Sequence, residues 1–174
     1  MTPRPKLYDD QVCKNAAAVL APKVVKWDQQ SDGWFSLEEV TKSLADGMKH
    51  HSEDGYDFAR FLESYHNYTP DSALVEILDE AWFLQREALK VLEKAWIEAN
   101  QPPAPVVESQ VVWKKDGSKG IVTRNEPSGH SVVCFPQKGH MRGAIGTQGI
   151  VIPWEDLEAA PVTETKAETK ESQQ

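Results

Sequence analysis

Residues 28–39 place oxygen-bearing groups at intervals that suit a hard cation. Calcium takes six to eight oxygen ligands from carboxylate, amide, hydroxyl and backbone carbonyl groups. Gly33 allows the sharp turn that such a loop needs between its ligands. The candidate ligands are Asp28, Gln30, Asp32, the Trp34 carbonyl, Ser36 and Glu39.

This segment, DQQSDGWFSLEE, resembles the loop of an EF-hand. The resemblance implies Ca²⁺ as a possible ligand, with Glu39 as the bidentate closing carboxylate. Two features depart from the family pattern. Gln30 is neutral where the family has Asp or Asn, and the chain has no second loop at the spacing of a paired hand. We expect no other cofactor.

A plain helix start explains part of the same segment without a metal. Asp32 and Gly33 form a turn, and Ser36 with Glu39 forms the S-x-x-E pattern of a capping box. The apolar residues that follow then begin an amphipathic helix. The segment is compatible with both interpretations, the capped helix and the calcium loop.

Residues 69–100 are predicted to form one long central helix. Thr69 suits the N-cap, Pro70 the first helical position and Asp71 the first turn. Asn100, followed by Gln101 and two prolines, ends the helix. Two apolar stripes repeat at intervals of three and four residues, so the helix is expected to be covered on two sides. They are Val75, Leu78, Trp82, Gln85, Leu89, Leu92, Trp96 and Ala99, and Leu74, Ile77, Ala81, Leu84, Ala88, Val91 and Ala95.

The preceding helices carry enough apolar residues, notably Trp27, Phe35, Phe58 and Phe61, to cover one of these stripes. The other stripe has no obvious cover. We therefore predict that Trp82, Gln85 and Trp96 contact either the C-terminal part of the chain or a protein partner, and a homodimer through this helix is an alternative.

The segment between the first helices and the long one is aromatic. Residues 56–65 carry Tyr56, Phe58, Phe61 and Tyr65, which we expect to be core residues, and residues 50–55 are expected to be a solvated loop. DGYDFARFLESY and TPDSALVEILDEA resemble helical segments in small accessory proteins of bacteria and phages. That resemblance implies no biochemical role.

Beyond a proline linker at 101–108, the pattern changes to short strands separated by Gly-containing turns. Residues 109–160 resemble an SH3-like barrel of the KOW kind, on the residues 120–122, 125–130 and 132–135 and the closing EDLE turn. Family members bind nucleic acid or proteins, or serve only as packing modules. If this one binds nucleic acid, Trp113, Phe135 or Trp154 could stack on bases. The basic candidates are Lys114, Lys115, Lys119, Arg124, Lys138, His140 and Arg142.

Composition limits the remaining possibilities. The net charge of −8 disfavours nonspecific binding of the whole chain to nucleic acid or anionic membranes. Most of the acidic excess lies in residues 1–100, whereas acidic and basic residues nearly balance after 106. No signal peptide, membrane span or disulfide framework is expected, so we predict a cytoplasmic protein.

The sequence therefore predicts an α+β protein: a flexible leader at 1–10, a helical domain at 11–100, the linker, the small barrel and a disordered tail at 161–174. No nucleophile, phosphate-loop or zinc-protease motif is present. We predict a non-enzymatic protein-interaction module, an accessory or inhibitor protein of bacterial or phage origin. Calcium binding and nucleic-acid association are the alternatives.

Overall fold

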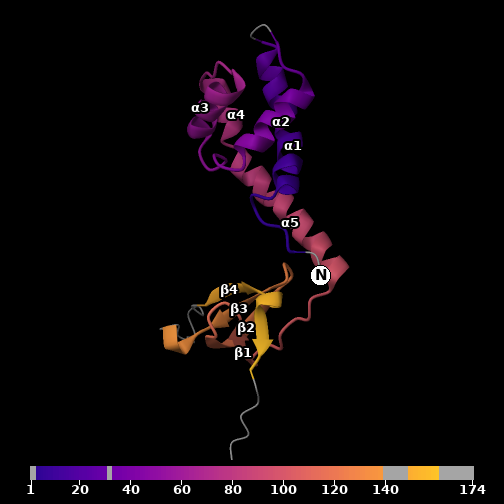
Figure 1. The fold of residues 1–174 in the computed structure, drawn as a ribbon, viewed down its shortest axis with the longest axis vertical. Coiled ribbons are helices and arrows are strands. Elements are labelled where there is room, and N and C mark those ends of the chain that lie inside the picture. Colours follow the sequence, from indigo (N-terminus) through magenta and orange to yellow (C-terminus); the bar gives the residue numbers. More distant parts are fainter. Residues whose placement is uncertain (1–2, 31–32, 139–148, 161–174) are drawn as a thin grey trace, which may run out of the picture. The chain divides into compact units, whose positions relative to one another are not determined.

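In the computed structural model the chain divides into a helical unit, residues 1–101, and a sheet unit, residues 102–174 (Figure 1). The structure describes residues 3–30, 33–138 and 149–160. Five α-helices precede a five-stranded antiparallel sheet, so the predicted α+β class is confirmed. No helix among the described residues is long and apolar enough to cross a membrane.

The first three helices lie close to where the sequence places them. They are α1 (Asp10–Asp28), α2 (Leu37–Gly47) and α3 (Gly55–His66). Pro22 lies inside α1 without ending it, and it occupies an exposed position. Ahead of α1, residues 3–9 contain no helix, but the Leu7 carbonyl accepts a hydrogen bond from a side chain of the fifth helix.

The prediction of one helix over 69–100 is wrong. The structure has α4 (Ser72–Leu78) and α5 (Ala81–Asn100), separated by a turn at residues 79–80. At this turn the Asp79 carboxylate accepts a hydrogen bond of 3.0 Å from the Gly55 N–H at the start of α3. A Cβ atom at position 55 would lie 2.6 Å from the Val75 backbone carbonyl oxygen, so this close approach of α3 and α4 requires glycine.

The start of α4 also differs from the prediction. Asp71, not Thr69, is the N-cap, and its Oδ1 accepts a hydrogen bond of 2.9 Å from the Leu74 N–H. The same oxygen accepts a bond of 2.9 Å from the indole N–H of Trp27 in α1. Asp71 therefore caps α4 and fixes it to α1 at once.

The core of the helical unit lies between α1, α2, α3 and α4, where Figure 1 shows α1 beside α2 and α3 beside α4. Its fully buried side chains include Leu20, Leu44, Phe58 and Leu62. Tyr68 stacks on Phe35 with a ring-centre distance of 4.4 Å, and burial raises the pKa of Tyr68 to about 12. The predicted core roles of Trp27 and Phe58 are confirmed by their burial.

Helix α5 has one buried side rather than two covered stripes. The buried residues Ala81, Gln85 and Trp96 come from both predicted stripes, while Phe83 and Val91 are 64% and 67% exposed. Both stripes step by three and four residues, so they lie side by side on the helix. The buried side of α5 runs along their shared border.

The sheet unit contains β1 (Gln110–Trp113), β2 (Lys119–Glu126), β3 (His130–Cys134), β4 (Ile150–Pro153) and β5 (Leu157–Ala159). Two short 3₁₀ helices, η1 (Pro136–Lys138) and η2 (Trp154–Asp156), follow β3 and β4. The strand order is β4-β3-β2-β1-β5. The predicted strand residues 120–122 and 132–134 lie in β2 and β3, whereas the predicted closing EDLE turn runs from η2 into β5.

The chain between β4 and β5 requires this sheet to curl. The two strands lie at opposite edges of the order, yet only the three residues of η2 separate them. Four strand spacings in a flat sheet would place the edges about 19 Å apart. A 3₁₀ turn of that length advances only about 6 Å. Among the described residues no ladder joins β4 to β5, so the curled sheet is open at this seam.

The inside of the curl holds a small apolar core of Val122, Val133, Phe135, Ile152 and Leu157. A register shift between residues 122 and 124 interrupts the β2–β3 ladder, and a bulge of this kind lets a strand bend.

The second half of the predicted linker is attached to this unit. The Asn125 side-chain amide donates a hydrogen bond of 2.7 Å to the Pro105 carbonyl, and the Glu108 N–H donates one of 2.7 Å to the Val122 carbonyl. Residues 105–108 therefore lie along the sheet instead of acting as a free spacer. Cys13 and Cys134 are both buried, one in each unit, and no disulfide joins them.

Candidate docking surfaces

The predicted calcium ligands lie at the connection between α1 and α2, where several already have protein partners. Asp28 is the last residue of α1, and its buried carboxylate accepts a hydrogen bond of 2.9 Å from the Phe35 N–H. Trp34 is 84% exposed, and Gln30 is exposed as well. Asp32 lies outside the described residues, so the structure does not place the central ligand.

Ser36 and Glu39 form the capping box that the alternative interpretation predicted. The Glu39 carboxylate accepts bonds from the Ser36 N–H at 2.9 Å and from the Ser36 hydroxyl at 2.6 Å. The Glu39 N–H in turn donates 3.2 Å to the Ser36 hydroxyl oxygen. These bonds hold the pKa of Glu39 below its usual value. The capped helix start is confirmed, and calcium binding stays a prediction.

Gln85 has a structural role that the sequence did not suggest. Its side chain is fully buried. Its amide nitrogen donates hydrogen bonds of 2.8 Å to the Leu7 carbonyl and of 3.2 Å to the Met48 carbonyl. It thereby joins α5 to the leader and to the end of α2. The prediction that Gln85 faces a partner does not fit this position, because no partner could reach the amide.

The two tryptophans that accompany Gln85 both have a cation from the same unit over the ring. The Arg4 guanidinium lies 5.1 Å from the ring centre of Trp96, which is 7% exposed. The Arg86 guanidinium lies 5.7 Å from the ring centre of Trp82, which is half-buried. The leader thus covers part of the stripe predicted to lack a cover. A homodimer through α5 stays a prediction.

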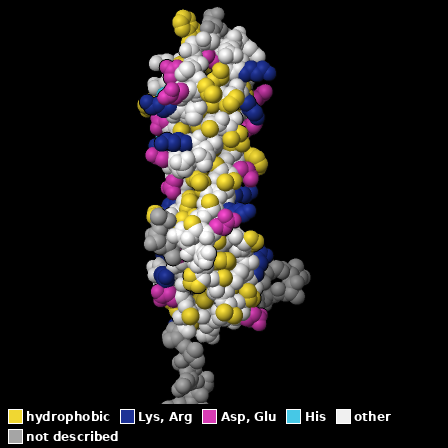
Figure 2. All heavy atoms as spheres, turned by 90° about the vertical axis from the view of Figure 1, so that its right-hand side faces the viewer, with side chains coloured by type: hydrophobic (Ala, Val, Ile, Leu, Met, Phe, Trp, Pro, Cys, Tyr) yellow, Lys and Arg dark blue, Asp and Glu magenta, His cyan; other side chains and the backbone are white. Residues whose placement is uncertain are grey.

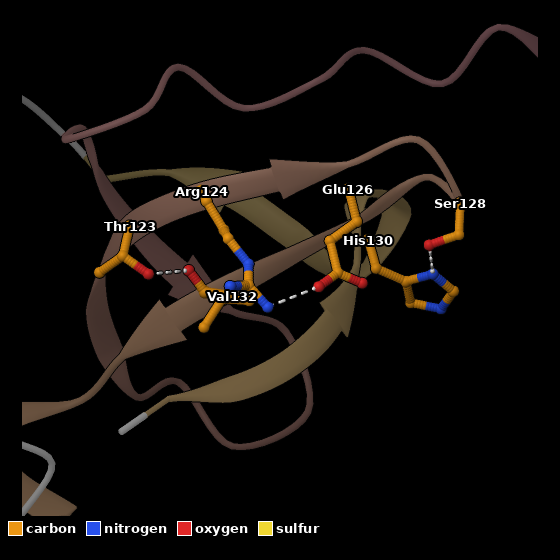
Figure 3. A network of polar contacts seen from close by, with 6 residues as sticks. All are labelled: Thr123, Arg124, Glu126, Ser128, His130 and Val132. Atoms are coloured by element: carbon orange, nitrogen blue, oxygen red, sulfur yellow. Dashed lines mark hydrogen bonds and ion pairs between the residues drawn. The ribbon is translucent and has the colours of Figure 1, made fainter. Parts of the chain in front are cut away.

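The basic candidates of the sheet unit are largely engaged by neighbouring groups. Lys114 donates 2.7 Å to the Glu155 carbonyl, and Lys115 lies 5.5 Å from the Trp113 ring centre. Figure 3 shows Arg124 directed at Glu126, with a distance of 3.0 Å between the guanidinium and the carboxylate. Lys119 is exposed near the start of β2.

The other predicted nucleic-acid contacts differ in burial. Phe135 is fully buried, so its ring cannot stack on a base, whereas Trp113 and Trp154 are half-buried. Lys138 ends η1, and the structure does not describe its side chain. His140 and Arg142 lie outside the described residues. Nucleic-acid binding by this unit stays a prediction.

The helical unit has a wide hollow of about 900 Å³ along α2. Small and apolar side chains, Leu37, Thr41 and Ala45, line it together with acidic and basic residues in equal number. One of these pairs, Lys49 with Asp10, is joined at 2.8 Å. Figure 2 shows hydrophobic side chains interspersed with both charges on the α1 and α2 side of this unit. With mixed charge, the hollow offers nothing that would select one class of partner.

A second surface combines aromatic rings that belong to α3 and the loop before it. His51 stacks on Phe61 at a ring-centre distance of 4.9 Å, and Phe61 lies 5.0 Å from Tyr65. Phe61 also lies 5.4 Å from His66, and the rings of His50 and His51 are 6.2 Å apart. Tyr65 is 73% exposed. We call this set the α3 aromatic surface: His50, His51, Phe61, Tyr65 and His66.

Two adjoining hollows lie on this surface and share His51 and Asp57. One, of about 390 Å³, is lined by Phe61, Tyr65 and Arg60, among others. The other, of about 300 Å³, is lined by residues that include Tyr8, Glu53 and Asp54. The hollow with the aromatic rings and the hollow with the acidic side chains therefore adjoin each other at His51 and Asp57.

The prediction that the aromatic residues of 56–65 are core residues is right for Phe58 and wrong for Tyr56 and Tyr65. Phe58, Phe61, Leu62 and Tyr65 follow the i, i+3, i+4, i+7 spacing of one helix face, so spacing alone does not distinguish the buried members from the exposed one. Phe58 and Leu62 are fully buried, whereas Tyr65, in the last turn of α3, is exposed.

The α3 aromatic surface can stack rings and attract cations, which is the chemistry of recognition rather than of a reaction. Among the described residues no cluster of His, Cys, Asp and Glu side chains is arranged to hold a metal ion. No protein family model, curated protein or solved structure matches this chain.

Proposed function

We propose that this chain is a non-enzymatic protein-interaction protein, of the accessory or inhibitor kind, and that it docks on a macromolecular partner through the α3 aromatic surface. The observation that carries the proposal is the exposure of Tyr65, 73%, at the end of a continuous series of ring contacts. Exposed tyrosines over a half-buried ring are typical of the centres of protein interfaces.

The neighbouring charges support a protein partner over a nucleic acid. Glu53, Asp54 and Asp57 border the hollows, and the helical unit carries most of the acidic excess of the chain. Phosphate groups would be repelled from this surface, because nucleic-acid binding depends on cations that neutralise phosphates.

We propose that the sheet unit is an SH3-like barrel that serves as a packing or docking module. The order β5-β1-β2-β3-β4, the bulge in β2 and the 3₁₀ turn ahead of the last strand support this assignment. The engagement of Lys114 and Arg124 with carbonyl and carboxylate oxygens argues against a nucleic-acid role for the module.

Quantitative co-purification from the native host tests the docking proposal. Tyr65→Ala should reduce recovery of the partner about tenfold or more, the usual effect of truncating a central interface residue. Val91→Ala is the matched control, since Val91 is similarly exposed on α5 and remote from the ring series in sequence. Equal losses for both variants, or no loss for Tyr65→Ala, would exclude the α3 aromatic surface as the docking site.

A further inference from the structure

The aromatic rings of this protein differ in whether the chain itself supplies a cation to them. Trp82, Trp96 and Trp113 each have an Arg or Lys cation between 5.1 and 5.7 Å from the ring centre. No such contact reaches Phe61 or Tyr65 from the residues that the structure describes. The α3 aromatic surface therefore presents ring faces to which the described chain supplies no cation.

Acidic groups adjoin the same rings. Asp57 lines both hollows, and within the described part of the chain no salt bridge or hydrogen bond engages its carboxylate. Asp54 caps α3 through one oxygen, which accepts hydrogen bonds from the N–H groups of Tyr56 and Asp57. Glu53 accepts a bond of 3.3 Å from the Tyr8 hydroxyl.

The cation nearest to this surface does not neutralise it. Arg60 lines one hollow, but its guanidinium lies 3.6 Å from the Glu63 carboxylate, one turn further along α3. The surface thus combines the exposed Tyr65 ring with an excess of carboxylates.

We propose that the α3 aromatic surface binds an arginine-rich segment of a protein partner. A guanidinium group stacks on the exposed Tyr65 ring, next to Phe61, and the Asp57 carboxylate accepts its hydrogen bonds. The inference rests on the proposed docking function and names the chemistry of the partner. Arginine fits better than lysine, because its planar group stacks on rings and forms paired bonds with one carboxylate.

A peptide titration with the full-length chain tests the inference. Fluorescence anisotropy compares labelled peptides of alternating glycine with arginine, lysine or glutamate, and a single-stranded RNA of similar length. We expect the arginine peptide to bind at least about fivefold more tightly than the lysine peptide, since only the planar guanidinium both stacks on a ring and forms paired hydrogen bonds with one carboxylate. The glutamate peptide and the RNA should not bind.

The variants separate stacking from general attraction between charges. Tyr65→Ala and Asp57→Asn should each weaken binding of the arginine peptide about fivefold or more, while Val91→Ala leaves it unchanged. Tyr65 and Asp57 are exposed, so both variants should keep the helical content of the parent chain, which circular dichroism checks.

Three results would overturn the inference: equal binding of the arginine and lysine peptides, arginine binding that Tyr65→Ala leaves intact, or preferential binding of the RNA. Absence of any peptide binding would overturn it as well. The docking proposal fails separately, because it depends on whether Tyr65→Ala loses the native partner, whatever the chemistry of that partner.

Discussion

Asp71 is predicted to stabilise the helical unit by more than a helix N-cap alone would. Its Oδ1 accepts two hydrogen bonds of 2.9 Å, from the Leu74 N–H and from the indole of Trp27. Loss of an N-cap costs about 1 kcal/mol. Loss of the acceptor for the indole N–H of Trp27, a residue only 8% exposed, costs about 1 kcal/mol more.

Asp71→Ala should therefore lower the free energy of unfolding by about 2 kcal/mol. For a unit of this size that corresponds to a fall of about 10 °C in Tm. Asp71→Asn keeps an acceptor oxygen and should lose less than half as much. Thr69→Ala should change the stability by less than about 0.5 kcal/mol, because Thr69 is exposed and is not the cap.

The assay is urea unfolding followed by circular dichroism at 222 nm, a signal that the five helices dominate. The reasoning would be refuted if Asp71→Ala and Thr69→Ala had equal effects, or if Asp71→Asn were as damaging as Asp71→Ala. The pKa of Asp71 is lowered, chiefly by the bond from the Leu74 N–H. Its stabilisation should accordingly be present at neutral pH and be lost as the pH falls through that lowered pKa.

Three further predictions concern Gln85, the capping residue Glu39 and the candidate calcium loop. Gln85→Leu should destabilise the helical unit by about 1–3 kcal/mol in urea unfolding, because the Leu7 and Met48 carbonyls lose their donor; a neutral effect would contradict this. Glu39→Gln should be less stable than the parent chain at pH 7, and the difference should vanish as the pH falls through the Glu39 pKa, which the Ser36 bonds hold below 4.5; a pH-independent difference would argue against the capping box. Millimolar Ca²⁺ should leave the Tm unchanged, since Ser36 already engages the Glu39 carboxylate, whereas a rise in Tm that Glu39→Ala abolishes would establish the calcium loop.

Local patterns were sufficient where the structure depends on neighbouring residues. The S-x-x-E pattern at Ser36 and Glu39 predicts the capping box because both partners lie within one helical turn. The turns at Gly117 and Gly129 were also predicted, and both glycines have the positive φ values that such turns favour. The change from helical to strand periodicity after the prolines likewise predicted the two units.

The missed features depend on contacts between distant parts of the chain. At the turn between α4 and α5, Asp79 accepts a hydrogen bond from Gly55, 24 residues away. The burial of Gln85 depends on Leu7, 78 residues away. Neither pair belongs to a periodic pattern or a known motif. The sequence pattern alone therefore favours one continuous helix over residues 69–100.

The α3 aromatic surface lies between these two cases. The helical spacing of Phe58, Phe61, Leu62 and Tyr65 places all four on one face of α3, and this spacing is visible in the sequence. Which of them are buried depends on how α2 and α4 pack against that face, and the sequence does not show this. The sequence also shows the acidic residues Glu53, Asp54 and Asp57, but it does not show that they lie next to the aromatic rings.

The central claim, docking through the α3 aromatic surface, is tested most directly by site-specific photo-crosslinking in the native host. A photoreactive phenylalanine analogue at position 65 should form a crosslink to one partner, and the same analogue at position 91 of α5 should not, although both positions are exposed. Crosslinking from position 91 but not from position 65 would contradict the account.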